Sequence, residues 1–533
     1  MRAPFLLIGL LALAGCQAGA PVATPAQAVA SDPAEFLYAE QSIADLQARM
    51  ASGELDSRTL TRAYLERIAR IDRTGPALHA VLALNPQAMA EAAERDRDRQ
   101  RGIVHGPLHG IPLLLKDNID ATPMATSAGS EALAGYRPPD DAFLVRRLRA
   151  AGAVILGKAN LSEWANFRSN DSISGWSAVG GQTRNPYALD RNPCGSSAGS
   201  AVAAAANLTA ATIGTETDGS IICPAAVNGV VGLKPTVGLV SRDGIVPISW
   251  SQDTAGPIAR SVADAAVLLQ AMAGRDPDDA STGYALGATF DYTSHLRPGG
   301  LRGARLGVLR DSFGYAPEGA KLMEGAITVL RQAGATVVDA RIPTAGQWDQ
   351  DEELLLKSEF KASLARYLRR GGAPLQTLAQ LIGFNQQHAH SELALFGQDL
   401  FEQADAAPGL DDPAYIQARS HARQLAGPQG IDAALKAQHL DALVSLASGP
   451  AWRTDPRLGD KFPGASYSAA AVAGYPSLTV PMGFTGNGLP LGILFTGRAW
   501  SEGRLIELAY DYEQRTGART PPRYPPAATT PVR

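Results

Sequence analysis

Short apolar runs that alternate with helix-like segments constrain the fold of this chain more than any other feature of its sequence. Buried strands are expected at 112–115, 153–156, 306–309, 335–342, 442–446, 478–481 and 491–495. Helices are expected at 57–72, 142–151, 200–206, 262–273 and 319–332, with Ser57 as the N-cap of the first. This alternation predicts an α/β fold with helices on both faces of the sheet.

The length of the chain, 533 residues, limits how its core can be organised. A single hydrophobic core stops growing at ~250–300 residues, so we expect two or three sub-cores or one very large layered domain. Apolar residues make up 45% and charged residues 19%, a balance typical of a globular protein. The net charge is −4, so no nucleic-acid partner is expected. Residues 350–440 are expected to form a helical insert.

The N-terminus has the pattern of an export signal. An apolar run at 5–13 is too short to span a bilayer and ends in Leu-Ala-Gly followed by Cys16, which resembles the lipobox of bacterial lipoproteins. An ordinary secretory signal with a chance cysteine is the alternative. We therefore expect a lipoprotein signal peptide at 1–15, lipid on Cys16, a flexible tether at 16–41 and the folded domain at 42–525. The protein would then be exported and lipid-anchored to a bacterial cell-envelope membrane, facing the periplasm.

Three polar segments carry residue types that suit a hydrolase. Lys116 follows an apolar triplet at the end of an expected strand, where burial favours the neutral amine that can act as a general base. A loop of small residues contains Ser196 and Ser197 and leads into the Ala-rich helix. A second polar turn ends in Gly219 and Ser220, so backbone N–H groups there can approach a reacting atom closely.

Together these segments resemble the amidase signature family, which combines a lysine in a Lys-Asp-Asn context, a Gly-Ser-Ser loop and a nucleophilic serine. Ser196 and Ser220 are 24 positions apart, and Lys116 precedes Ser196 by 80. Further markers of the family stand at 232–236, 253–260 and 473–479. The resemblance covers nearly the whole chain after the tether and implies a large mixed β-sheet core covered by helices on both faces.

The resemblance also implies a role for each polar residue. Ser220 attacks the carboxamide carbon, and Ser196, which follows a cis peptide bond in the family, relays the proton to neutral Lys116. The oxyanion hole is formed by the backbone N–H groups of Thr217, Asp218, Gly219 and Ser220. Asp218 stands where the family usually has glycine, so its side chain can alter the choice of substrate.

The implied reaction is hydrolysis of carboxamides to carboxylic acid and ammonia through a serine acyl-enzyme. Segments 176–186 and 215–220 look most like bacterial peptide amidases, so peptide C-terminal amides are the expected substrates. Asn170 and Trp176 are expected to bind the substrate. No metal and no cofactor are expected, and the enzyme is expected to be a monomer whose partner is a small-molecule or peptide amide.

Three other functions fit part of the sequence. Residues 195–199 match the G-x-S-x-G motif, which would make Ser197 the nucleophile of an α/β-hydrolase-type esterase, although 189–193 before it is loop-like. The amidase subunit of a tRNA-dependent amidotransferase shares the fold, but export would separate it from its tRNA. A non-enzymatic binding lipoprotein leaves the three polar catalytic residues unexplained.

Other motifs are weaker signals. Residues 152–159 nearly spell a P-loop, but alanine replaces the Ser/Thr that would bind Mg²⁺. Ser358 fits an S-x-x-K motif without the K-T-G motif that accompanies it elsewhere. His388 and His390, two positions apart on an expected helix, face different ways and do not suggest a shared metal.

Cys194 and Cys223 each lie within three residues of a proposed catalytic serine. They are either two buried thiols beside the site or a disulfide. The sequence does not give the Cα separation that decides between these alternatives.

Overall fold

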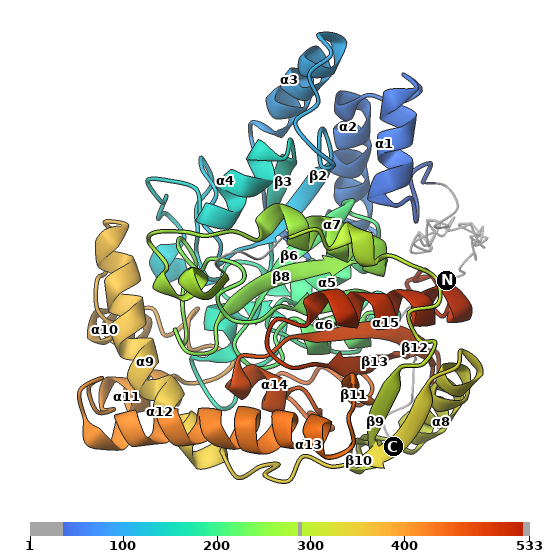
Figure 1. The fold of residues 1–533 in the computed structure, drawn as a ribbon. Helices are drawn as coiled ribbons and strands as arrows, with labels where there is room; N and C mark the ends of the chain where they lie inside the picture. The colour runs from blue at the N-terminus through green and yellow to red at the C-terminus, as the bar shows by residue number, and fades with distance from the viewer. Residues whose placement is uncertain (1–35, 286–289, 526–533) are drawn as a thin grey trace, which may run out of the picture.

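The computed structural model describes residues 36–285 and 290–525, and its centre is one sheet of eleven strands (Figure 1). Across the sheet the order is β1 (Val81–Leu84), β3 (Val154–Ala159), β2 (Pro112–Lys116), β6 (Ala211–Glu216), β8 (Thr254–Ala259), β7 (Val231–Lys234), β12 (Ser477–Phe484), β13 (Pro490–Thr496), β11 (Ala442–Leu446), β9 (Arg305–Leu309) and β10 (Thr336–Ala340). The sheet is mixed: β3–β2–β6 and β11–β9–β10 are parallel, and the other pairings are antiparallel.

Helices cover both faces of this sheet. α5 (Ala198–Ala205) and α6 (Ile222–Val227) lie on one face, and α7 (Val262–Met272) and α15 (Glu502–Thr516) lie on the other (Figure 1). Every residue of α5 is buried, because its small Ala, Gly and Ser side chains allow the helix to pack closely on the strands beneath it. The predicted α/β fold with a large mixed sheet covered on both faces is confirmed.

The remaining helices of the sheet layers are α1 (Ile43–Ala51), α2 (Ser57–Arg67), α3 (Ala88–Gln100), α4 (Phe143–Ala150), α8 (Pro317–Gln332) and α14 (Ser468–Ala473). The expected N-cap of α2 is wrong by one residue. Asp56 takes that place, and its carboxylate accepts a hydrogen bond from the Thr59 N–H at 2.6 Å.

The stretch expected as a helical insert, 350–440, consists mainly of helices that lie to one side of the sheet (Figure 1). They are α9 (Asp349–Arg370), α10 (Leu378–Gln387), α11 (Asp399–Asp405), α12 (Pro413–Ala426) and α13 (Asp432–Ala437). Phe360, Leu364 and Phe401 form a core of their own there, together with Trp164 from the sheet side. This layer therefore packs against the loops at one edge of the sheet.

Four strands of the large sheet were not expected from the sequence: β1, β6, β7 and β8. A separate two-stranded sheet of β4 (Trp176–Ser177) and β5 (Gly181–Gln182) was not expected either. β6 (ATIGTE) and β8 (TAGPIA) contain glycine, threonine or proline instead of a continuous apolar run, although all their residues are buried. Gly214 in β6 leaves space for the side chain of Ser197, because a Cβ at this position would lie 2.8 Å from Ser197 Oγ. The sheet register brings β2 and β6 together in parallel, with Leu115 opposite Ile213.

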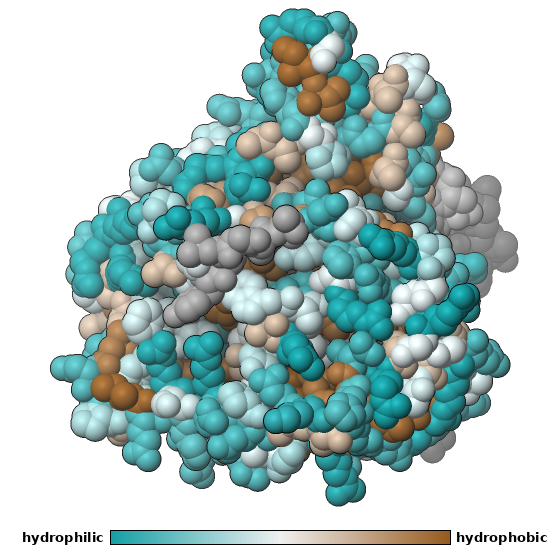
Figure 2. Space-filling model, viewed as in Figure 1, coloured by the Kyte–Doolittle hydropathy of each residue, from teal (hydrophilic) through white to brown (hydrophobic). Residues whose placement is uncertain are grey.

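The surface seen in Figure 2 is mostly hydrophilic, with apolar residues in small separate groups. Within 36–285 and 290–525, no helix has the length and apolar character that crossing a membrane requires. The expected signal peptide, Cys16 and most of the expected tether lie outside the described residues.

Candidate active site

Lys116 ends β2 and is fully buried. Its Nζ lies 2.8 Å from Thr215 Oγ1, 3.2 Å from the Thr215 carbonyl oxygen and 2.7 Å from Ser196 Oγ. Loss of water around a buried ammonium lowers the pKa of Lys116 from 10.5 to about 7, against the opposing attraction of Asp253 and Glu216. A neutral amine at this position is therefore well populated at neutral pH.

Ser196 and Ser197 lie in the loop just before α5, and both are fully buried. The Gly195–Ser196 peptide bond is cis, as the family resemblance implies. The Ser197 hydroxyl donates to the Thr215 carbonyl at 3.0 Å and accepts from the Thr215 N–H at 3.2 Å. The Ser197 hydroxyl therefore holds the loop against β6. No strand leads directly into Gly195, which the G-x-S-x-G motif of an α/β-hydrolase requires. The structure therefore does not support the esterase alternative with Ser197 as nucleophile.

Ser220 lies in the turn between β6 and α6, and 8% of its surface is exposed. Glu216, at the end of β6, accepts hydrogen bonds from the N–H groups of Ile221 and Ile222 at 2.7 and 3.0 Å. Ser220 O in turn accepts from the Ser197 N–H at 3.1 Å. The two serine-bearing loops are therefore joined through the backbone, although in the described part of the chain no hydrogen bond links Ser220 Oγ to Ser196 Oγ.

The turn before Ser220 has backbone N–H groups free for an incoming oxyanion. Among the residues that the structure describes, no backbone or side-chain acceptor is bonded to the N–H groups of Thr217, Asp218 and Ser220. Gly219 has φ +81°, and a Cβ built on it would lie 2.1 Å from Tyr467 Cε2. Glycine is required there both by the backbone conformation and by the aromatic ring packed on it.

Asp218, the residue that departs from the family pattern, lies beside Glu352 of α9. Burial raises the pKa of Asp218 well above its usual value, and repulsion from Glu352 and Glu216 adds to this. Burial likewise raises the pKa of Glu352 to about 7. Glu352 accepts a hydrogen bond from Gln252 Nε2 at 2.8 Å, and the same amide group donates to Thr217 O at 3.3 Å. α9 is thereby connected to the turn that precedes Ser220.

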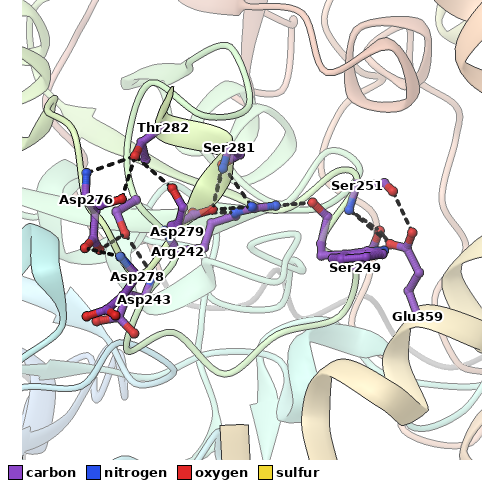
Figure 3. Close-up of polar contacts among 12 residues, drawn as sticks. Arg242, Asp243, Ser249, Ser251, Asp276, Asp278, Asp279, Ser281, Thr282 and Glu359 are labelled. Atoms are coloured by element: carbon purple, nitrogen blue, oxygen red, sulfur yellow. Dashed lines mark hydrogen bonds and ion pairs between the residues drawn. The ribbon is translucent and has the colours of Figure 1, made fainter. Parts of the chain in front are cut away.

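A second carboxylate of α9 secures the adjoining loop. Glu359 is fully buried and accepts from Ser249 Oγ at 2.5 Å and from Ser251 N at 3.0 Å (Figure 3). The same loop leads to Asp253, which accepts from Thr217 Oγ1 at 2.6 Å. The helical layer therefore supports the Thr217 end of the turn, which no sequence motif indicated.

The cysteines left open by the sequence are joined in a disulfide, with their Cα atoms 6.0 Å apart. It connects the loop that carries Ser196 to α6, the helix after Ser220. Sequence reasoning also missed the buried ion pair between Lys158 and Asp117, 2.8 Å apart. Lys158 belongs to the near P-loop segment, which forms strand β3 instead of a phosphate-binding loop.

The two expected substrate-binding residues lie on the side of α11. Asn170 is exposed, and its Nδ2 donates to the Asp399 carboxylate at 2.6 Å. Trp176 packs edge-on against Phe396, with ring centroids 5.2 Å apart. The described contacts of both residues do not include Ser196 or Ser220, so their role in binding substrate stays a prediction.

Comparison with known proteins agrees with this geometry. The family model described as Amidase matches residues 59–506. A protein named "Probable amidase" from Arabidopsis thaliana is 41% identical over 501 residues, with 92% of each chain covered. A glutamyl-tRNA(Gln) amidotransferase subunit from Thermosynechococcus vestitus is 35% identical, covering 89% of this chain and 98% of its own. The crystal structure of the native peptide amidase from Stenotrophomonas maltophilia is 66% identical, with a TM-score of 0.89 over 91% of this chain and 99% of the other.

The fold and the matched residues define a hydrolase that acts on amide C–N bonds. The chain belongs to the amidase family, the family that its Lys-Ser-Ser motifs indicated.

The expected location is wrong. The relatives that match about nine-tenths of this chain are described as amidases and as amidotransferase subunits, and none is described as exported or lipid-anchored. The export prediction depended on a single local pattern, the apolar run at 5–13 followed by Cys16. Similarity over the full domain carries more information, so the export and lipid-anchor expectation is withdrawn.

Proposed function

We propose that Ser220, Ser196 and Lys116 catalyse the hydrolysis of C-terminal peptide amides to the free carboxylic acid and ammonia. The hydrogen bonding of Lys116 carries this proposal. A neutral amine has two N–H groups and one lone pair, and two acceptors on Thr215 use both N–H groups. The lone pair is left for the hydroxyl of Ser196, 2.7 Å away. Lys116 is thereby arranged to accept a proton from Ser196.

The steps follow from this arrangement. Ser220 Oγ attacks the carboxamide carbon while its proton moves to Ser196, whose own proton moves to Lys116. The negative charge that develops on the carbonyl oxygen is held by the free N–H groups of Thr217, Asp218 and Ser220, where one donor is typically worth a factor of ~10²–10³ in rate. The N–H of Gly219, the fourth donor expected from the sequence, is directed to the Glu216 carboxylate. Lys116 returns its proton through Ser196 to the departing nitrogen, which leaves as ammonia. Water then cleaves the acyl-enzyme by the same route in reverse order.

A peptide on the acyl side is supported by the relatives. Two of the structures at 66% identity are named peptide amidase, and one of these is a complex with the competitive inhibitor chymostatin. The amidotransferase subunits share 35–37% identity, so the transfer of ammonia inside a complex is the less favoured function. We propose that the enzyme acts as a monomer, with Asn170 and Trp176 in its substrate-binding region.

Ammonia release from an amidated dipeptide by the purified chain, without ATP or partner proteins, tests this function. We expect turnover in the wild type and in Lys321→Gln, a change at an exposed residue of α8, and none in Ser220→Ala. Ser197→Ala is expected to keep the acyl-enzyme chemistry, because Ser197 only fastens its loop to β6. Full activity of Ser220→Ala would refute the assignment of the nucleophile.

A further inference from the structure

The peptide unit that joins Thr217 to Asp218 lies in the turn just before Ser220. No acceptor among the described residues is bonded to the Asp218 N–H, whereas the Thr217 carbonyl oxygen accepts a hydrogen bond from Gln252 Nε2 at 3.3 Å. This peptide bond is trans, and its atoms lie in one plane, so the carbonyl oxygen and the N–H point in opposite directions. A hydrogen bond that holds the Thr217 carbonyl therefore also fixes the direction of the Asp218 N–H.

Gln252 is fully buried and joins the turn to α9. A primary amide nitrogen carries two N–H groups, and Nε2 of Gln252 donates to Thr217 O and to Glu352 Oε1, the latter at 2.8 Å. Its Oε1 is buried and, in the part of the chain that the structure describes, has no partner. Exchanging the amide oxygen and nitrogen would turn Oε1 toward two acceptors, so the two donated bonds define the orientation of this side chain.

The loop that carries Gln252 is attached to α9 at a second point. Glu359, about two turns after Glu352 on that helix, accepts hydrogen bonds from Ser249 and Ser251 (Figure 3). Both attachments are made by carboxylates of one continuous helix. α9 therefore sets where the Gln252 amide lies relative to the turn.

The other half of the turn is held without α9. Gly219 packs under the ring of Tyr467, and Glu216 accepts two backbone N–H groups at the start of α6. These contacts keep Ser220 in place independently of Gln252. Loss of the link from α9 is therefore expected to release the Asp218 N–H and to leave the nucleophile where it is.

We propose that Gln252 and Glu352 are positioning residues: together they hold the Thr217 carbonyl so that the Asp218 N–H points to the oxyanion. This inference rests on the proposed amide hydrolysis. Neither side chain contacts the substrate or exchanges a proton with it. The full negative charge on the carbonyl oxygen exists only in the tetrahedral intermediate, so a correctly directed N–H lowers the barrier more than it strengthens binding of the peptide.

Steady-state kinetics on an amidated dipeptide separates these two effects. Gln252→Met removes both donors and keeps the length of the side chain, and Glu352→Leu removes the acceptor that orients the amide. Each is expected to lower kcat about 10–100-fold, with KM within about twofold, because acylation and deacylation both pass through an oxyanion. Glu352→Gln keeps an acceptor oxygen and is expected to retain kcat within about threefold. Glu353→Leu changes the next, exposed carboxylate of α9 and provides the unchanged control.

Inhibitor binding distinguishes positioning from a general loss of structure. A peptide aldehyde forms a hemiacetal with Ser220, and the hemiacetal oxygen occupies the oxyanion site. The corresponding peptide alcohol has no carbonyl and binds without this contact. In Gln252→Met and Glu352→Leu, the inhibition constant of the aldehyde is expected to rise about 10–100-fold and that of the alcohol to stay within about twofold. The double variant should match the slower single variant, because both changes break the same link.

The outcomes separate this role from the proposed function. A wild type that releases no ammonia from the dipeptide amide refutes the proposed function and this inference with it. An active wild type with unchanged kcat in both single variants refutes the positioning role alone, and so does an equal loss of affinity for the aldehyde and the alcohol. Additive losses in the double variant would show that the two residues act separately, which also contradicts the proposal. If Gln252→Met does not fold, Glu352→Leu decides by the same two measurements.

Discussion

The neutral form of Lys116 makes the most specific prediction. At pH 7 an ordinary lysine with a pKa of 10.5 is neutral in about one molecule in 3,000, whereas a pKa of about 7 leaves roughly half of the molecules neutral. We therefore expect kcat/KM to rise through an acid limb centred near pH 7 and to stay high above it. The assay is ammonia release from an amidated dipeptide between pH 5 and 10, with the stability of the enzyme checked at each pH.

Two neighbouring carboxyl groups titrate in the same range and need controls. Burial raises the pKa of Asp253 to about 6 and that of Glu352 to about 7. Glu352→Gln removes one of these groups and keeps a hydrogen-bonding side chain of the same size, so the limb near pH 7 should remain. A limb that disappears in Glu352→Gln, or one centred near pH 10, would show that Lys116 is not the base.

Protein stability gives a second measure of the same pKa, independent of catalysis. The unfolded chain binds a proton at Lys116 below pH 10.5, but the folded chain binds it only below about pH 7, so this lysine destabilises the fold increasingly as pH falls from 10.5 to 7. Lys116→Met removes this effect. The unfolding free energy of Lys116→Met minus that of the wild type should therefore be about 3 kcal/mol larger at pH 7 than at pH 10. An equal difference at both pH values in denaturant titrations would refute a lowered pKa.

Three further changes test the surroundings of the site. Gly219→Ala should abolish turnover, because its Cβ would collide with the Tyr467 ring; full kcat would mean that the turn can rearrange. The double change Cys194→Ser and Cys223→Ser should lower the unfolding free energy by about 3–4 kcal/mol, because the disulfide closes a loop across 29 positions and restricts the unfolded chain. An unchanged denaturation midpoint would contradict this prediction. Lys158→Met should lower the unfolding free energy by about 3–5 kcal/mol, because Asp117 is left as an unpaired buried charge. Lys361→Met, a change at an exposed lysine, is the control. Equal denaturation midpoints for the two variants would contradict the prediction.

The sequence predicted the parts of the fold that depend on local patterns. The apolar run before Lys116 and the Ala-rich segment after Ser196 became β2 and α5, since continuous burial leaves a clear pattern in the residues. β6 and β8 escaped prediction because their glycine, threonine and proline residues do not form an apolar run, and only the neighbouring strands bury them.

The candidate site shows the same division. Lys116, Ser196 and Ser220 were identified from motifs, whereas Thr215, which uses both N–H groups of Lys116, has no motif that marks its role. Glu352 and Glu359 reach the site from α9, more than 130 positions after Ser220. Such contacts depend on how the helical layer packs against the sheet, and spacing along the chain does not reveal them.

The covalent intermediate on Ser220 is the central claim of this account, and rapid-quench mass spectrometry tests it directly. The purified enzyme is mixed with a peptide methyl ester or amide, quenched in acid and digested, and the mass of each peptide is measured. We predict a mass increase equal to the acyl group on the peptide that contains Ser220, and no such increase in Ser220→Ala. An acyl group on Ser197, or turnover with no acylated serine at any quench time, would contradict the account.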